Sequence, residues 1–478
     1  MDSAMSSRGR VRPDGAEARL RRWALTAALG GFAFGYELAV ISGALLFLRG
    51  DFGLSGLEQG ALVSAVPLGA IAGGLLASRV ADALGRRGAL MLIAALFIAS
   101  TALAVAAPSY GVLLVARALT GVAVGAVSST APLYLSEIAP AAQRGRLVAF
   151  NQLMITLGIV VAYCVGLVFS SSGSWRAMFA VGLVPSAALL AGMLRAPETP
   201  AWLEAHGDAA GARQVLAQIV GEEEAERVLD DLRRAHDRTA RRIGLAALVR
   251  SSAAPALLVG LTLAVVQQFA GINAVIAYAP SIMERTGLSA SNSILSSIAL
   301  GVANVTATVV AIGLVDRRGR RPLLLASTAG TFATLALLGL TLQASLGAWG
   351  RWLALLCLVG YIIAFGIGLG PIFWLLIAEI FPPEARAAGA GIATAVNWGS
   401  SFLVGLVFVP LTDAIGQGPT FWLLAAVCAF GFAFAKRYVP ETRGRSLTEI
   451  EAEVRARFGS AGRSGPATHW RAGAPRGS

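Results

Sequence analysis

The sequence predicts an all-α membrane protein whose twelve transmembrane helices form two pseudosymmetric six-helix halves. The chain of 478 residues is 56% hydrophobic and only 14% charged, with a mean hydropathy of +0.69, whereas soluble domains carry about 25% charged residues. In addition, three charged motifs occur twice in the same order, about half a chain apart. A soluble all-helical protein is the alternative, but the apolar runs are too long and too free of charge for it.

Each predicted transmembrane helix corresponds to an apolar segment of about 20 residues or more, enough to cross the hydrocarbon layer at about 1.5 Å per residue. Six segments precede a polar insert and six follow it, so we expect an N-terminal half over 23–195 and a C-terminal half over 251–438. The expected segments cover approximately 23–48, 58–80, 88–107, 111–132, 147–170, 176–195, 254–283, 291–315, 322–343, 351–379, 387–411 and 419–438.

The polar insert at 196–250 combines acidic residues and many arginines with Leu, Val and Ile at helical spacing. This pattern predicts short amphipathic helices under the bundle, with a flexible linker as the alternative. The chain also has polar tails at 1–22 and 439–478. Their outer parts, 1–20 and about 458–478, are poor in apolar residues, so we expect them to be disordered.

The distribution of charge predicts the topology. Basic residues outnumber acidic ones by 39 to 27, a net charge of +12, and the arginines gather in alternate loops. This alternation is typical of the positive-inside rule, and it does not favour nucleic-acid binding. We expect a multi-pass, monomeric protein of the cell (inner) membrane, in contact with the lipid bilayer, with both termini and the insert in the cytoplasm.

The sequence contains no pattern typical of an enzyme or of a cofactor site. Cys164, Cys357 and Cys428 lie in apolar segments without metal-ligand spacing or any sign of a disulfide. The three histidines lie in the insert or the C-terminal tail. Because neither a nucleophile–base pair nor a phosphate-binding loop is found, we expect no enzymatic activity, no metal and no cofactor.

The three repeated motifs indicate that one ancestral half was duplicated, and paired six-helix halves are a transporter architecture. Each copy lies in loops on the expected cytoplasmic side. Opposite charges there would form a latch that holds the halves together when a carrier opens outward; orientation by positive charge alone is the alternative. The predicted latch residues are Asp82, Arg86, Arg87, Glu137, Arg144 and Glu198 in the first copy and Asp316, Arg320, Arg321, Glu379, Arg386 and Glu441 in the second.

Two charged residues lie deep inside apolar segments: Glu37 in the first segment and Arg117 in the fourth. A charge at this depth costs roughly 3 kcal/mol on insertion scales, so it indicates a functional site. A carboxylate whose proton affinity changes with its partner and its hydration is what a proton-coupled carrier requires. A permanent salt bridge between two helices is the alternative.

The seventh segment contains Gln267, Gln268 and Asn273, three amides within seven residues of an apolar helix. Buried amides are costly without partners, and they offer both donors and acceptors, which suits the hydroxyls of a neutral polyol. Contacts between helices are the alternative role for each of them. The other candidates for this site are the isolated amides Gln152, Asn304 and Asn397 and the aromatic residues Trp374 and Trp398.

The tenth segment contains a predicted hinge. Gly366, Gly368 and Gly370 are followed directly by Pro371. Three glycines and a proline interrupt a helix, so we expect this segment to bend during transport.

Together these motifs resemble the sugar porter family of the major facilitator superfamily over about 23–450. The resemblance rests on the Gly-Tyr-Glu string at 35–37, the Gln-Gln-x-x-Gly-Ile-Asn string at 267–273, the Pro-Glu-Thr strings at 197–199 and 440–442, and the repeated charged motifs. It implies the major facilitator fold and proton-coupled import of a monosaccharide, a hexose or a pentose, by alternating access. A passive facilitator of the same fold is the alternative.

The resemblance also assigns roles to residues. Glu37 matches the position where proton symporters of the family carry Asp and facilitators carry Asn, and Arg117 matches its partner. Phe34 and Trp398 match positions that line the sugar cavity. The matches to sugar-contacting positions are Gln152, Gln267, Gln268, Asn273, Asn304, Trp374 and Asn397.

Four positions depart from the family pattern. Glu37 is one methylene longer than the usual Asp, and Ala277 replaces the first of two tyrosines of an outer gate, leaving Tyr278. Ala201 replaces an arginine after the first Pro-Glu-Thr string, and Ile159 stands where some bacterial xylose carriers have Gln.

Two other classes fit the sequence less well. An exporter of amphiphiles would have a more apolar cavity than this amide-rich segment provides. A sugar-sensing receptor would require a signalling domain, and residues 451–478 are too short for one. We therefore expect a small-molecule sugar and a proton as the partners.

Overall fold

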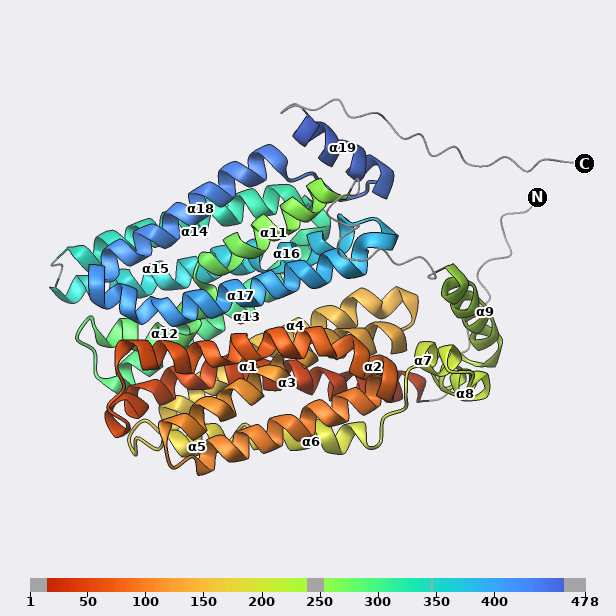
Figure 1. The fold of residues 1–478 in the computed structure, drawn as a ribbon, viewed down its shortest axis with the longest axis horizontal. Helices are drawn as coiled ribbons and strands as arrows, with labels where there is room; N and C mark the ends of the chain where they lie inside the picture. The colour runs from red at the N-terminus through yellow and green to blue at the C-terminus, as the bar shows by residue number, and fades with distance from the viewer. Residues whose placement is uncertain (1–14, 239–252, 345–346, 460–478) are drawn as a thin grey trace, which may run out of the picture.

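The computed structural model describes residues 15–238, 253–344 and 347–459. Every regular element in these ranges is helical. Long helices lie side by side in two groups, one from each half of the chain, and the predicted all-α fold class is confirmed (Figure 1). The first group contains α1 (Ala16–Asp51), α2 (Gly56–Ala106), α3 (Tyr110–Ile138), η1 (Ala141–Gln143), α4 (Arg144–Val168), α5 (Trp175–Ala180) and α6 (Leu183–Met193).

Three short helices connect the two groups, and a further short helix follows the second group. The short helices are α7 (Pro200–Ala205), α8 (Ala209–Val220), α9 (Glu222–Arg238) and, after the second group, α19 (Leu447–Gly459). The second group itself contains α11 (Ala254–Phe269), α12 (Ile272–Glu284), α13 (Ala290–Arg318), α14 (Arg320–Gln343), α15 (Gly347–Ile367), α16 (Leu369–Glu379), α17 (Pro383–Ile415) and α18 (Gln417–Tyr438).

Helix α2 contains two of the predicted transmembrane segments. Eleven helical stretches of the described residues are long and apolar enough to span a membrane, one fewer than the predicted segments, because α2 runs for 51 residues. A straight helix of that length would be roughly 77 Å long. Gly85 interrupts it with a left-handed φ of 80°. Val66 and Thr101 both lie near Arg117 and its partner Glu37, so the chain reverses at Gly85 and crosses the bundle twice.

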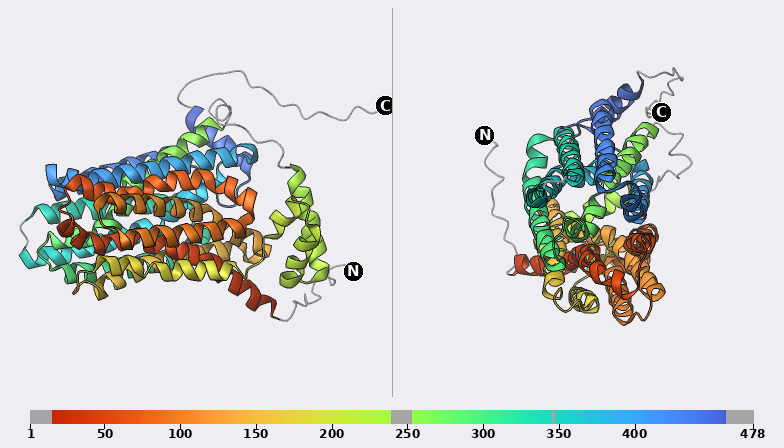
Figure 2. Two further views of the ribbon diagram at one scale, coloured as in Figure 1. Left: turned by 60° about the horizontal axis from the view of Figure 1, so that its bottom comes forward. Right: turned by 90° about the vertical axis from the view of Figure 1, so that its left-hand side faces the viewer.

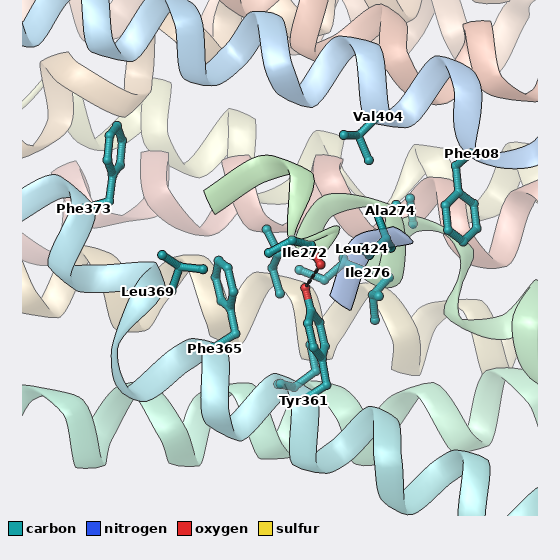
Figure 3. Packing of buried hydrophobic residues seen from close by; sticks show 14 of the residues in the cluster. Ile272, Ala274, Ile276, Tyr361, Phe365, Leu369, Phe373, Val404, Phe408 and Leu424 are labelled. Atoms are coloured by element: carbon teal, nitrogen blue, oxygen red, sulfur yellow. Dashed lines mark hydrogen bonds between the residues drawn. The ribbon is translucent and has the colours of Figure 1, made fainter. Parts of the chain in front are cut away.

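Two other spans are broken near the middle of the second group. The chain leaves helical geometry at Gly271, which has a φ of 92°, between α11 and α12, and at Gly368 between α15 and α16. The second break lies at the predicted hinge, whereas the first was not predicted. Tyr361 of α15 donates to the carbonyl of Ala270 at 2.9 Å, which satisfies a carbonyl freed by the first break (Figure 3).

The two groups meet along three pairs of helices: α1 with α12, α4 with α13, and α2 with α17. Small residues permit the close approach. A Cβ at Gly60 of α2 would clash with the backbone carbonyl of Leu406 in α17, so only glycine fits there.

The polar insert folds into α7, α8 and α9, which lie beside one end of the bundle (Figure 2). Residues 239–250 of the insert lie outside the described residues. The expected disorder of 1–20 is wrong at its end, because α1 already begins at Ala16. Leu20 and Trp23 of α1 belong to the same buried cluster as Val215 and Ile219 of α8, and this apolar contact orders the additional turns.

Candidate functional site

Glu37 and Arg117 form a buried ion pair between α1 and α3. Arg117 Nη1 donates to Glu37 Oε2 at 3.1 Å, and Nη2 donates to the Glu37 backbone carbonyl at 3.0 Å. The side chains are only 2% and 1% exposed. Such a pair costs considerable desolvation, and removing one partner typically costs about 3–5 kcal/mol because the other charge is left buried.

Thr101, from the second span of α2, also contacts this pair. Its hydroxyl donates to Glu37 Oε1 at 3.2 Å, so both carboxylate oxygens have a donor. The sequence analysis missed Thr101. A single hydroxyl in an apolar helix carries little signal, because most of them bond to their own helix backbone.

Four of the predicted sugar-site amides lie together between α11, α12 and α17. Gln268 Nε2 donates to Asn397 Oδ1 at 3.0 Å, and Asn397 Nδ2 donates to Gln267 Oε1 at 2.6 Å. Asn273 Nδ2 donates to Gln268 Oε1 at 3.0 Å. Asn397 lies 129 residues after Gln268 in the chain. In this conformation the four amides serve as hydrogen-bond partners for one another.

Two further groups extend this amide network. Ser401, one helical turn after Asn397, accepts from Asn273 Nδ2 at 2.8 Å. Gln267 Nε2 donates to the carbonyls of Leu369 and Gly370, at 3.2 Å and 3.0 Å, so the network is bonded directly to the helix break of the tenth span. Ser401 was missed by the sequence analysis, although its spacing of four residues from Asn397 places both on one helix face.

Phe34 of α1 and Trp398 of α17 meet across the two halves, with ring centroids 6.0 Å apart. Trp398 is buried, and its Nε1 has no hydrogen-bond partner among the described residues. Gln152 is exposed, Asn304 is half-buried and Trp374 is 40% exposed. No hydrogen bond within the described ranges joins these last three to the amide network.

The first copy of the repeated motifs forms a compact cluster in which Glu198 is central. It accepts from the backbone N–H groups of Arg86 and Arg87, at 2.9 Å and 3.0 Å, where a new helical run begins after Gly85. A helix N-terminus favours an anion. Position 85 requires a glycine for two reasons: its φ is 80°, and a Cβ there would clash with Glu198.

The side chains of this copy complete the cluster. Arg86 bonds to Glu137 at 3.0 Å and to Asp82 at 3.1 Å. Thr199, the residue after Glu198, donates to Glu137 at 2.6 Å. Its position in the repeated Pro-Glu-Thr string was a signal that the sequence analysis did not use.

The second copy repeats this geometry. Glu441 accepts from the backbone N–H groups of Arg320 and Arg321, at 3.0 Å and 3.1 Å, and Gly319 has a φ of 87°. Arg320 bonds to Glu379 at 3.0 Å. Burial alone would raise the pKa of the Glu441 carboxyl, but N–H donation by Arg443, Arg320, Arg321 and Thr442 lowers that pKa below its ordinary value.

The remaining predicted latch residues contact the nearby backbone. Arg87 donates to the Met193 carbonyl, Arg321 to that of Lys436, Arg144 to that of Ser136 and Arg386 to that of Phe381. The side chain of Asp316 lies outside the described part of the structure. The ion pairs and hydrogen bonds described here for the predicted latch residues therefore all lie within one half.

Hydrogen bonds between the halves are found toward the opposite end of the bundle. Arg49 at the end of α1 bonds to Glu284 at the end of α12 at 2.7 Å. The other two between described residues of the two halves are Tyr163 to the Ile276 carbonyl, at 2.9 Å, and Ser170 with Ser291, at 3.0 Å.

Two helical halves, with a buried ion pair in one and an amide network in the other, are typical of a membrane transport protein, and the family and structures that match the chain are transporters and not enzymes. The model of the sugar (and other) transporter family matches residues 23–454, and the chain belongs to this family. The resemblance found in the sequence is therefore confirmed.

Relatives agree with this assignment over nearly the whole chain. The glucose transporter GlcP of Staphylococcus epidermidis is 39% identical over 434 residues, covering 91% of this chain and 97% of that protein. The galactose-proton symporter of Escherichia coli is 36% identical over 437 residues, covering 90% and 93%.

Solved structures show the same fold. The xylose transporter XylE from E. coli in a partially occluded inward open conformation matches with a TM-score of 0.80 and 30% identity, covering 90% of this chain and 100% of that chain. XylE bound to 6-bromo-6-deoxy-D-glucose, described as a major facilitator superfamily proton:xylose symporter, matches with a TM-score of 0.76 and 30% identity, covering 91% and 99%. The predicted major facilitator fold is confirmed.

Proposed function

We propose that this protein imports a monosaccharide, a hexose or a pentose, together with a proton across the cell (inner) membrane by alternating access. The observation that carries the proposal is the buried Glu37–Arg117 pair, whose arginine lines one small cavity together with Asn273 of the amide network. A glucose transporter, a galactose-proton symporter and a D-xylose transporter among the relatives support this substrate class.

In this mechanism the amides exchange their mutual hydrogen bonds for bonds to sugar hydroxyls. Gln267, Gln268, Asn273 and Asn397 can each act as donor and acceptor, so the exchange leaves no buried polar group unpaired. Trp398 offers a free N–H. Gln152, Asn304, Trp374 and Phe34 would join the site as the halves close around the sugar.

Glu37 carries the proton. Protonation removes its charge and releases it from Arg117, which favours closure around the sugar; when the site reopens inward, the ion pair forms again and the proton leaves. The halves 23–195 and 251–438 move about this site, while the motif clusters latch their cytoplasmic ends in the outward-facing state. Both termini lie in the cytoplasm, and one chain contains the whole site, which supports function as a monomer.

A passive facilitator is the second candidate. Arg117 holds Glu37 through both a side-chain and a backbone hydrogen bond, as expected of a permanent structural salt bridge.

Uptake into proteoliposomes separates the two candidates. Purified protein would be tested with labelled D-glucose, D-galactose and D-xylose under an inward proton gradient, with and without an uncoupler. A symporter concentrates its sugar and loses the accumulated sugar when the uncoupler is added. A facilitator only equilibrates the sugar and ignores the uncoupler, and that result would reject symport.

A further inference from the structure

A small cavity lies between the ion pair and the amide network. It has a volume of about 20 Å³, which is room for about one water molecule. Helices of both halves enclose it: α1, α2 and α3 on one side and α12 and α17 on the other. Most of its lining is apolar, and the polar side chains that line it are Arg117, Asn273 and Ser401.

Each of these three side chains has hydrogen-bonding capacity that the protein leaves unused. Arg117 is 1% exposed, yet its Nε has no partner within the described residues. Asn273 donates through Nδ2, while none of those residues donates to its Oδ1. The Ser401 hydroxyl accepts from Asn273 and keeps its own proton free to donate.

This combination suits a water molecule. A buried water usually makes two to four hydrogen bonds, and a buried polar group without a partner costs about 1–3 kcal/mol. One water in this cavity would accept from Arg117 and donate to Asn273 Oδ1 or to Ser401. Ala277 also lines the cavity, and it stands where many relatives carry a tyrosine, whose ring would occupy this space.

We propose that the cavity binds one ordered water molecule that links Arg117 to Asn273 and Ser401. The inference rests on the proposed proton-coupled function and assigns positioning roles to Ser401 and Ala277. Among the described residues, two side chains donate hydrogen bonds to the Glu37 carboxylate: Arg117 of α3 and Thr101 of α2. Arg117 is the only charged residue in the described ranges that lines the cavity. When a sugar displaces the Asn273 side chain, the hydrogen bonds of the water change. The hydrogen bonding of Arg117 then changes as well, and with it the ion pair to Glu37.

Two variants test this link in the full-length protein. Ala277→Val fills the cavity, and Ser401→Ala removes one of its polar partners. Ser400→Ala is the matched control, because Ser400 is a buried serine next to Ser401 that does not line the cavity. Proteoliposomes loaded with each variant would be compared for sugar counterflow, which needs no proton movement, and for accumulation driven by a proton gradient.

We expect Ala277→Val to keep counterflow within about twofold of the wild type while lowering the accumulation ratio roughly 2- to 10-fold, the effect of losing one net hydrogen bond. Ser401 also accepts from Asn273 of the amide network, so for Ser401→Ala we expect a similar loss of accumulation after correction for its own counterflow rate. Ser400→Ala should match the wild type in both assays. Full accumulation by both variants would overturn the link and leave symport intact. Loss of counterflow in folded Ala277→Val protein would also overturn it, because the cavity would then belong to the sugar site. If the wild type exchanges but never accumulates sugar, symport itself fails and the link fails with it.

Discussion

Gln268 occupies the centre of the amide network, because it donates to Asn397 and accepts from Asn273. We predict that Gln268→Ala weakens sugar binding by about 1–3 kcal/mol, since a sugar hydroxyl loses its hydrogen-bond partner and is left buried and unsatisfied. Calorimetric titration of the purified protein with each candidate sugar measures this effect. Gln59→Ala is the control, because Gln59 lies in the first turn of α2 and outside the amide network. Unchanged affinity for every sugar would mean that the network only packs helices together.

Glu441 provides a pH-dependent contribution to stability. Folding lowers the pKa of this carboxyl from its ordinary value of 4.5. It therefore stabilises the folded protein above that value, and the contribution disappears as the pH falls through the lowered pKa. We predict that Glu441→Gln lowers the free energy of unfolding by about 1–2 kcal/mol at pH 7, and that the difference from the wild type shrinks on acidification.

Thermal unfolding in detergent between pH 7 and pH 3 checks this prediction. Glu223→Gln serves as the control, since Glu223 is an exposed carboxylate on α9. A difference between Glu441→Gln and wild type that grows as the pH falls would contradict the assigned role of the backbone donors.

At the scale of elements, the ends of α1 and α12 are joined by the Arg49–Glu284 pair, which is 41% and 25% exposed. An exposed pair contributes at most about 1 kcal/mol, so we predict that Glu284→Gln shifts the balance toward the outward-open state by no more than about fivefold. Spin labels at Leu57 and Asn292, one in each half, would report the change as a longer distance. The exchanged variant Arg49→Glu with Glu284→Arg should return to the wild-type distance, and failure to do so would contradict a closing role for the pair.

The helices themselves were largely predictable from the sequence, because a bilayer requires about 20 consecutive apolar residues. Breaks inside spans were harder to find. The glycines before Pro371 gave a clear signal, whereas Gly271 is a single glycine in an apolar string, and its φ of 92° depends on how Tyr361 and the neighbouring helices pack. The two predicted segments 58–80 and 88–107 are joined by a reversal at Gly85, and the sequence did not indicate that a single residue makes this turn.

For the whole molecule, the sequence identified the repeated charged motifs but did not show which residues pair with which. The glutamates of both copies bond within their own half. Glu198 and Glu441 accept from backbone N–H groups, whereas Glu137 and Glu379 bond to the side chains of Arg86 and Arg320. The proposed latch between the halves would form only in a second, outward-facing conformation. The amide network would likewise differ between conformations. Its amides bond to one another here, and in the proposed sugar-bound state they would bond to the sugar.

The central claim is that the whole carrier couples sugar movement to the protonation of one residue, Glu37. Accumulation by proteoliposomes under an imposed proton gradient tests it most directly, comparing the wild type with Glu37→Gln and Glu37→Asp. Glutamine keeps the size and hydrogen bonding but cannot titrate, so Glu37→Gln should bind and exchange sugar yet lose uphill accumulation and its pH dependence. Glu37→Asp should remain coupled. If Glu37→Gln still concentrates sugar and an uncoupler still collapses that gradient, the proton is carried elsewhere and the account is wrong.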